Sequence, residues 1–201
     1  MLVREMFLRK NKFNVVIVFI IIFIQNICNS NEIPLTKAVN YLKDLNNFSV
    51  SFIQSDDFEI SEGKISFSKN RLRVDYSYPS KILIILSKNK AMYYNYELDE
   101  DEFFDPRNTS AWFFFEIFNN PDFFLDAKVR SKENSIILEK NGLNQSEEYK
   151  LKLYFENNPF LIRKIELNYQ GTKMVLSVSN HNFEESFNKN FFKLINPSIF
   201  D

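Results

Sequence analysis

From Phe48 onward, apolar residues recur at every second position in short runs, and this period constrains the fold more than any other feature. Phe48, Val50 and Phe52 alternate with Ser49 and Ser51. Because successive side chains of a strand point to opposite faces, each run predicts a strand with one buried face. Further runs cover residues 65–67, 72–76, 82–86, 91–97, 127–130, 135–139, 149–155, 161–168 and 173–179. Turn residues separate them at Asn141-Gly142, Asn157-Asn158-Pro159 and Gln170-Gly171, so we expect an antiparallel meander.

Two helices are expected beside these strands. Residues 35–45 place apolar side chains at the spacing of one buried helical face, and Pro34 suits the first turn. Residues 111–118 follow a cap-rich stretch, 108–110, and end before Pro121. This second helix holds Trp112, Phe113, Phe114, Phe115, Ile117 and Phe118. A helix that is apolar on nearly every side must be covered on most sides or must itself cover something.

The composition excludes several classes of function. Of 201 residues only 3 are Gly, and neither common phosphate-binding motif is present. The single His and single Cys exclude a His/Cys zinc cluster, and His181 is expected in a surface turn. The acidic run Asp99–Glu102 lacks the ligand spacing and the glycine of a calcium loop, so it predicts a solvated loop tip. A net charge of −1 gives the chain no excess of basic charge, so we expect the protein to bind no nucleic acid. No nucleophile, base and orienting residue can be grouped in the sequence, so we also expect a protein that is not an enzyme and has no catalytic residue, cofactor or metal.

Residues 1–30 have the pattern of a secretory signal peptide. Four basic residues precede an unbroken apolar run, 15–24, which is too short to span a membrane. The small residues Cys28 and Ser30 favour cleavage before Asn31. A lipidated Cys28 and an uncleaved anchor are the alternatives. Residues 31–201 show no repeat or linker and are predicted to form one exported domain.

The order of these patterns resembles the outer-membrane lipoprotein carrier protein family, LolA, from about Leu35 to Pro197. The segments that carry the resemblance are Phe48-x-x-x-Phe52-x-Gln54, the run from Gly63 to Tyr76 followed by Pro79, the pair of strands containing Ile84-Ile85 and Tyr93–Tyr96, the aromatic helix, and Phe191-Phe192-x-Leu194-x-x-Pro197. Each segment is weak alone, whereas their order and spacing together are more specific.

The resemblance implies a mainly β fold: a strongly curved, incomplete antiparallel β-barrel, with an N-terminal helix and short lid helices that enclose a hydrophobic cavity. It also implies a periplasmic carrier that buries the acyl chains of lipoproteins and shuttles them to the outer membrane. The implied partners are acylated lipoproteins, an inner-membrane lipoprotein-releasing ABC transporter and an outer-membrane lipoprotein receptor, and the carrier is expected to be a monomer. A lipid-sensing regulatory domain of the same fold and a lipid-anchored outer-membrane receptor are the alternatives.

The resemblance also implies which residues form the site. The family holds its lid shut with an arginine after the second strand, where this chain has Lys69 and Asn70, so Lys69 or Arg71 is expected to serve as the latch. The residues expected to line the cavity and form the lid are Phe52, Phe67, Leu72, Val74, Tyr76, Trp112, Phe113, Phe114, Phe115, Ile117 and Phe118.

Overall fold

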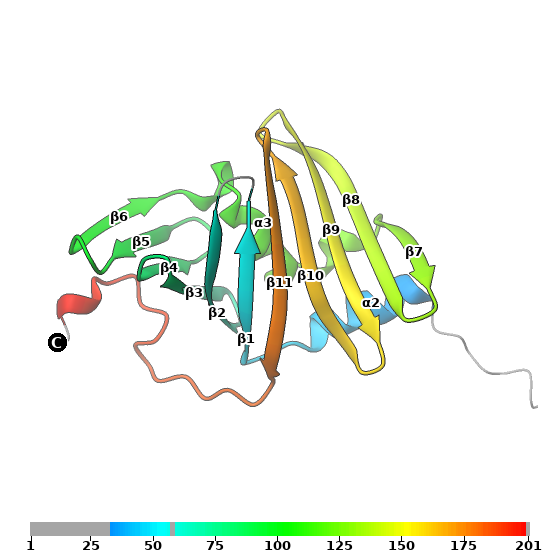
Figure 1. Ribbon diagram of the computed structural model, residues 1–201, viewed down its shortest axis with the longest axis horizontal. Coiled ribbons are helices and arrows are strands. Elements are labelled where there is room, and N and C mark those ends of the chain that lie inside the picture. Colours follow the sequence, from blue (N-terminus) through cyan, green and yellow to red (C-terminus); the bar gives the residue numbers. More distant parts are fainter. Residues whose placement is uncertain (1–32, 57–58, 200–201) are drawn as a thin grey trace, which may run out of the picture. The chain divides into compact units, whose positions relative to one another are not determined.

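The computed structural model describes residues 33–56 and 59–199, which form a mainly β domain (Figure 1). The predicted signal peptide, 1–30, lies outside these residues. No helix among them is long and apolar enough to cross a membrane.

The helices are α2 (Pro34–Asp44), α3 (Ala111–Asn119) and the 3-10 turns η1 (Pro106–Asn108), η2 (Pro121–Phe124) and η3 (Pro197–Ile199). The strands are β1 (Phe48–Ser55), β2 (Ile60–Ser68), β3 (Arg71–Tyr78), β4 (Ile82–Leu86), β5 (Ala91–Asn95), β6 (Glu100–Phe104), β7 (Lys128–Lys132), β8 (Ser135–Asn144), β9 (Glu147–Asn157), β10 (Phe160–Tyr169) and β11 (Thr172–Asn182).

All strands belong to one antiparallel sheet that does not close, with the order β6-β5-β4-β3-β2-β1-β11-β10-β9-β8-β7. The first and last strands pair in its middle, where Phe52 faces Val178. The two edge strands, β6 and β7, are consecutive in the chain, so the segment between them must run from one edge of the sheet to the other. That segment holds α3. The predicted incomplete barrel is therefore confirmed, and its connectivity places a helix across the open side.

The inner face of the sheet carries the apolar residues that the alternation predicted. Phe48, Val50 and Phe52 of β1 are each at most 2% exposed, and they join one hydrophobic cluster with residues of both helices. From α2 this cluster receives Ala38, Val39 and Leu42. Both helices thus pack against the same face of the sheet, and apolar burial on that face is the main source of stability.

Two details of the sheet differ from the sequence prediction. Of the acidic run expected as a loop tip, Asp99 lies in the β5–β6 turn, whereas the other three residues begin β6, where Glu100 faces Asn95 of β5. An edge strand tolerates such charges because its outer edge faces water. Asn141-Gly142, expected as a turn, lies inside β8, because the β8–β9 turn falls at Gln145 and Ser146. Both turn residues adopt left-handed backbone conformations, with φ of 52° and 72°, although neither is glycine.

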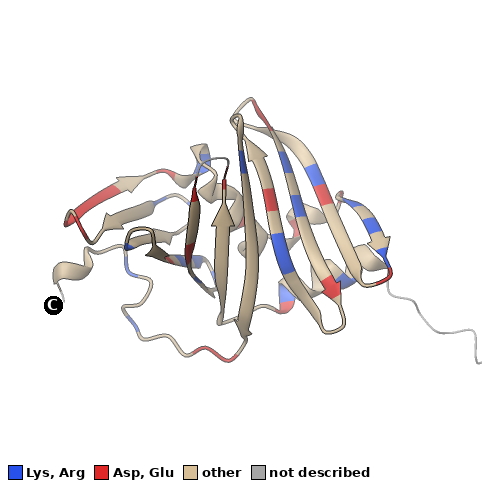
Figure 2. Ribbon diagram, viewed as in Figure 1, with Lys and Arg blue, Asp and Glu red and all other residues tan. Residues whose placement is uncertain are grey.

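The two edges of the sheet carry charges of opposite sign (Figure 2). Acidic side chains lie along β6 (Glu100, Asp101 and Glu102) and basic side chains along β7 (Lys128, Arg130 and Lys132). Charges on an exposed edge disfavour pairing with the same edge of another copy.

The residues after β11, 183–199, cross the outer face of the sheet, and we call them the C-terminal strap. Glu185 accepts hydrogen bonds from Ser49 and from Lys64, the latter at 2.9 Å. Leu194 packs on a second apolar cluster, on the outer face of β4 and β5. This cluster comprises Leu83, Ile85, Met92 and Tyr94. The apolar run of β4 is therefore buried on both faces, as its sequence predicted.

The anchor of the strap predicts a pH dependence. The hydrogen bonds from Ser49 and Lys64 hold the pKa of Glu185 below its ordinary value of 4.5. Because the folded-state pKa is lowered, the anchor stabilises the strap above that value and is lost as the pH falls through the folded-state pKa. Hydrogen exchange of strap amides, corrected for intrinsic rates, should therefore quicken at acid pH. The Glu185→Gln variant should show the quicker exchange already at pH 7; equal protection of variant and wild type at pH 7 would contradict the anchor.

Candidate functional site

The candidate site is the space between α3 and the inner face of the sheet. We call α3 and η2 the lid. A threonine precedes its first helix: Thr109 Oγ1 accepts a hydrogen bond from the backbone N–H of Ala111 at 3.2 Å and donates one to the carbonyl of Pro106 at 2.9 Å. Helix α3 ends at Asn119, and η2 continues the lid towards β7. The sequence prediction of a short helix at 111–118 is thus met within one residue.

The structure brings all the predicted cavity and lid residues into one hydrophobic cluster. From the sheet, Phe52, Phe67 and Leu72 are buried, and Val74 and Tyr76 are partly buried. From the lid, Phe113, Phe115, Ile117 and Phe118 are buried, and Trp112 and Phe114 are partly buried against the same cluster. Their role in binding a ligand stays a prediction.

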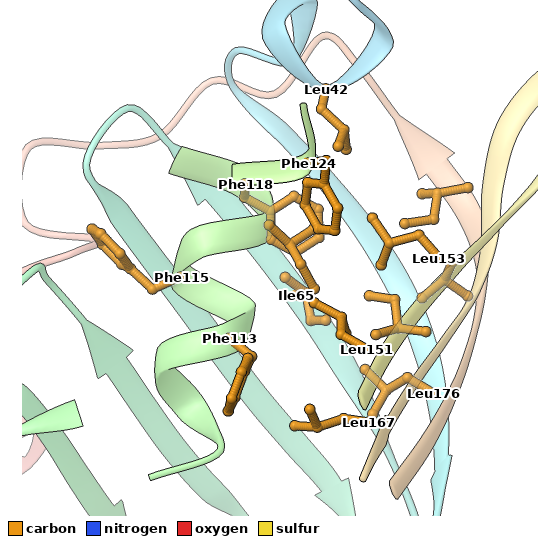
Figure 3. Close-up of a cluster of buried hydrophobic side chains, with 14 of the residues drawn as sticks. Leu42, Ile65, Phe113, Phe115, Phe118, Phe124, Leu151, Leu153, Leu167 and Leu176 are labelled. Atoms are coloured by element: carbon orange, nitrogen blue, oxygen red, sulfur yellow. The ribbon is translucent and has the colours of Figure 1, made fainter. Parts of the chain in front are cut away.

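Side chains of the lid itself occupy the interior. Phe113 is fully buried, with its ring centroid 4.8 Å from that of Tyr149 and 4.9 Å from that of Tyr169. Phe118 lies 5.7 Å from Phe48 by the same measure. Figure 3 shows Phe113 and Phe118 projecting from α3 among side chains of the sheet, whereas Phe115 projects from the other side of the helix. A ligand could enter this space only where lid side chains moved away.

Polar contacts on the inner face are few. Tyr76 Oη donates a hydrogen bond to Gln54 Oε1 at 3.0 Å. Burial among apolar side chains raises the pKa of Tyr76 to about 12, so the phenol stays neutral at physiological pH.

Within the described part of the chain, no group of three or more His, Cys, Asp or Glu side chains could hold a metal ion. His181, expected in a surface turn, lies instead in β11 and is partly buried, with Nε2 2.8 Å from the carbonyl oxygen of Ile162.

The predicted latch residues flank the turn between β2 and β3: Lys69 lies in the turn, and Arg71 is the first residue of β3. The contact from this turn to the lid is made by the residue between them: the backbone N–H of Asn70 donates to Asn119 Oδ1 at 2.7 Å. Arg71 donates to the carbonyl of Asn70 at 3.5 Å. Asn70 has a φ of 63°, a left-handed conformation that asparagine accepts better than most residues. The latch roles of Lys69 and Arg71 stay predictions.

Two ion pairs that the sequence analysis missed also fasten the lid. Asp122 of η2 pairs with Lys43 of α2 at 2.7 Å, and Asp126, just after η2, pairs with Lys140 of β8. Both carboxylates lie in or just after η2, whereas the lysines lie on α2 and on β8. The sequence holds one sign of the second pair: Lys140 follows Ile136 and Leu138 at every second position of β8, so its side chain points to the same inner face of the sheet.

A hollow of about 290 Å³ lies between the start of the lid and the β10–β11 hairpin. Thr109 and Ser110 line it on one side, and Leu167, Tyr169 and Met174 on the other. Asn144 Nδ2 closes the adjoining gap by donating to the carbonyl of Arg107 at 3.0 Å and to Tyr169 Oη at 3.1 Å. Since Tyr169 also contacts Phe113, this hollow lies next to the side chain that plugs the interior.

No model of a protein family matches the sequence. A curated relative, the uncharacterized protein RP864 of Rickettsia prowazekii (strain Madrid E), is 26% identical over 198 residues, which cover 96% of this chain and 91% of that protein. An uncharacterized conserved protein from Thermus thermophilus has a similar structure, with a TM-score of 0.50 at 8% identity over 81% of this chain and 93% of that one. MucB of Pseudomonas aeruginosa, solved with MucA, reaches 0.45 at 12% identity over 78% of this chain and 60% of that one.

These comparisons concern the fold. The likeness to the Thermus thermophilus protein shows that an open sheet of this architecture is shared beyond this chain. At such low sequence identity an activity cannot be transferred from one protein to another.

Proposed function

We propose that the protein is an exported, monomeric carrier that holds the acyl chains of lipoproteins beneath α3 and shuttles them from the inner to the outer membrane, without covalent chemistry. The observation that carries the proposal is the filling of the interior by the lid itself. Phe113 and Ile117, both fully buried, stand between an apolar helix and an apolar sheet face. Moving the lid would vacate an apolar, water-poor space of the kind that acyl chains require.

The lid is fastened weakly for the apolar area it covers. The Lys43–Asp122 pair is about half exposed on both sides, and exposed pairs of this kind contribute about 0–1 kcal/mol. Burying one of its phenylalanines contributes roughly 1.5–3 kcal/mol, whereas each CH₂ of an acyl chain contributes about 0.8 kcal/mol. The free energy lost when lid side chains leave the interior is therefore close to the free energy gained when an acyl chain replaces them. Such a balance suits a protein that must both bind and release its ligand.

A carrier of this type needs a donor and an acceptor. We propose an inner-membrane lipoprotein-releasing ABC transporter as the donor and an outer-membrane lipoprotein receptor as the acceptor. The signal-peptide pattern at 1–30 supports export to the periplasm. Mass spectrometry of the mature protein tests this step: an N-terminus at Asn31 agrees with a soluble carrier, whereas an acylated Cys28 would make the protein a lipid-anchored receptor.

Acyl binding can be read from Trp112, the single tryptophan of the chain. Trp112 lies on α3, partly buried against the hydrophobic cluster that includes the inner face of the sheet, so movement of the lid changes its surroundings. Adding a micromolar acyl-chain probe to delipidated protein should shift the emission of Trp112 and give a saturable binding curve. The Trp112→Phe variant should bind the probe, by equilibrium dialysis, without the emission change. Absence of saturable binding to the wild type rejects the proposal.

A further inference from the structure

We propose that the outer face of β7–β11 docks on the surface of an anionic membrane, so that the protein binds such a membrane weakly and reversibly. This surface lies on the side of the sheet opposite the lid and takes no part in holding a ligand. The inference therefore goes beyond the proposed function and does not depend on acyl binding.

The strand register shows which charged side chains point to the outer face. Lys128 of β7 lies opposite Glu139 of β8, and Glu139 lies opposite Lys152 of β9. The chain neighbours Leu138 and Leu153 belong to the inner hydrophobic cluster. Because successive side chains of a strand alternate between faces, this row of charged side chains points outward.

The fold gathers basic side chains on this outer face, although the chain as a whole has no basic excess (Figure 2). We call the surface the basic face, and its cations are Lys128, Arg130 and Lys132 of β7, Lys150 and Lys152 of β9, Lys164 of β10 and Lys173 of β11. The acidic side chains among them are fewer, and they are Glu139, Glu148, Glu156 and Glu166. Cations from four strands thus share one broad surface.

The central carboxylates lie beneath the cations. Glu139 is only 6% exposed and pairs with Arg130 at 3.4 Å and with Lys150 at 3.2 Å, whereas those two side chains are 68% and 44% exposed. Glu166, which is 23% exposed, pairs with Lys164 at 2.6 Å. The layer that meets the solvent is therefore mainly cationic.

Other cations of the basic face are not neutralised by an ion pair. Among residues 33–56 and 59–199, no carboxylate lies within ion-pair distance of Lys128, Lys152 or Lys173. Glu148 and Glu156 lie towards the two ends of β9, and Glu156 is paired with Arg163 at 2.7 Å. The middle of the face is thus left with a positive charge that an anionic surface can neutralise.

The scarcity of apolar side chains on this face decides which partner fits. Ile137, Tyr154 and Val175 lie between the cations and are already partly buried by their neighbours. A protein interface needs a core of apolar or aromatic anchors, whereas a fluid layer of anionic headgroups needs only cations within reach. The export predicted from residues 1–30 separates the protein from nucleic acids. The basic face therefore fits an anionic bilayer best.

Docking through the basic face leaves the lid uncovered, because α3 packs on the inner face of the same sheet. Each lysine near an anionic membrane surface strengthens binding about fivefold, and salt screens the attraction beyond about 8 Å at physiological ionic strength. A protein held only by such contacts exchanges between membrane and solution, as a shuttle must.

The experiment measures co-sedimentation of the purified exported protein with vesicles. Vesicles of phosphatidylcholine that contain anionic phosphatidylglycerol should bind the protein, whereas vesicles of phosphatidylcholine alone should not. Binding should be lost as NaCl rises from about 0.05 M to about 0.5 M, because the Debye length shortens.

Two triple variants of equal charge locate the docking surface. The first removes the lysines of the basic face that lack an ion pair, and it combines Lys128→Gln, Lys152→Gln and Lys173→Gln. We expect it to bind anionic vesicles at least about tenfold more weakly than wild type does. The control removes the same charge from exposed lysines outside the basic face, and it combines Lys81→Gln, Lys88→Gln and Lys189→Gln. The control should retain most of the binding.

Three results would overturn the inference: equal binding to both kinds of vesicle, equal losses in the two triple variants, or no binding to anionic vesicles. Binding of poly-glutamate through the same lysines, without binding to anionic vesicles, would assign the basic face to an acidic protein instead. Any contribution of residues 1–30 cancels, because all variants share the same N-terminus. The Trp112 titration with an acyl probe should be unchanged in the first variant, so docking and ligand binding are tested separately. A thermal melt confirms that each variant is folded.

Discussion

Replacing Phe113 with alanine should destabilise the protein and at the same time increase its affinity for an acyl chain. The ring is fully buried between Tyr149 and Tyr169, and truncating such a phenylalanine costs about 3–5 kcal/mol of unfolding free energy. The vacated volume lies where the ligand is proposed to bind, and the closed lid loses part of what holds it. Chemical denaturation measures the first effect and probe titration the second.

The matched control is Phe155→Ala. Phe155 is 1% exposed on the inner face of β9 and stacks on Phe160, with 5.2 Å between ring centroids, but it belongs to the sheet and not to the lid. It should lose comparable stability without gaining affinity, because its removal does not release the lid. If Phe113→Ala lost stability with unchanged or weaker binding, α3 would be an ordinary core helix and the proposed exchange would be wrong.

Replacing Gly63 with alanine should have the largest effect on folding of any small substitution in the sheet. An added Cβ would lie 2.2 Å from the backbone carbonyl oxygen of Asp75 and 2.8 Å from the ring of Phe52. The first contact is with backbone, which can retreat only by disturbing the pairing of β2 with β3. We expect a loss of about 3 kcal/mol or more in unfolding free energy, at the upper end of overpacking effects. Urea denaturation of the purified variant measures it.

Gly171→Ala is the control for this prediction. Gly171 has a φ of +75° in the β10–β11 turn, and beyond its two chain neighbours no residue comes within 4 Å of the position of an added Cβ. Its only penalty is the left-handed backbone, about 1–2 kcal/mol for a residue with a side chain. Equal losses at both positions would contradict the steric explanation for Gly63.

The sequence predicted some elements of the fold correctly and misplaced others. The alternation in β1 predicted both the strand and its buried face, because a period of two has only one regular solution. The spread of apolar residues around 111–118 predicted a helix that is covered on most sides or itself covers something. The β8–β9 turn was misplaced because Asn141-Gly142 is a strong turn signal, yet Gly142 serves close packing instead: an added Cβ there would lie 2.9 Å from Tyr149 Oη.

The candidate site shows the same division. Its apolar members could be identified from the sequence because periodicity marks them. Its fastenings could not, because they join residues far apart in the chain, such as Lys43 with Asp122 and Asn70 with Asn119. Sequence spacing carries no information about such contacts unless the topology is already known.

The sequence by itself determined a meander of strands, a helix before it and an apolar helix within it, because these follow from local periodicity and turn chemistry. Only the tertiary structure decided that β1 pairs with β11, so that β6 and β7 become the two edges and α3 must cross the open side between them. Pairing between strands that are distant in the chain depends on the curvature and closure of the whole sheet. The inward position of Lys140 gained its meaning only there, once Asp126 of the lid was found to be its partner.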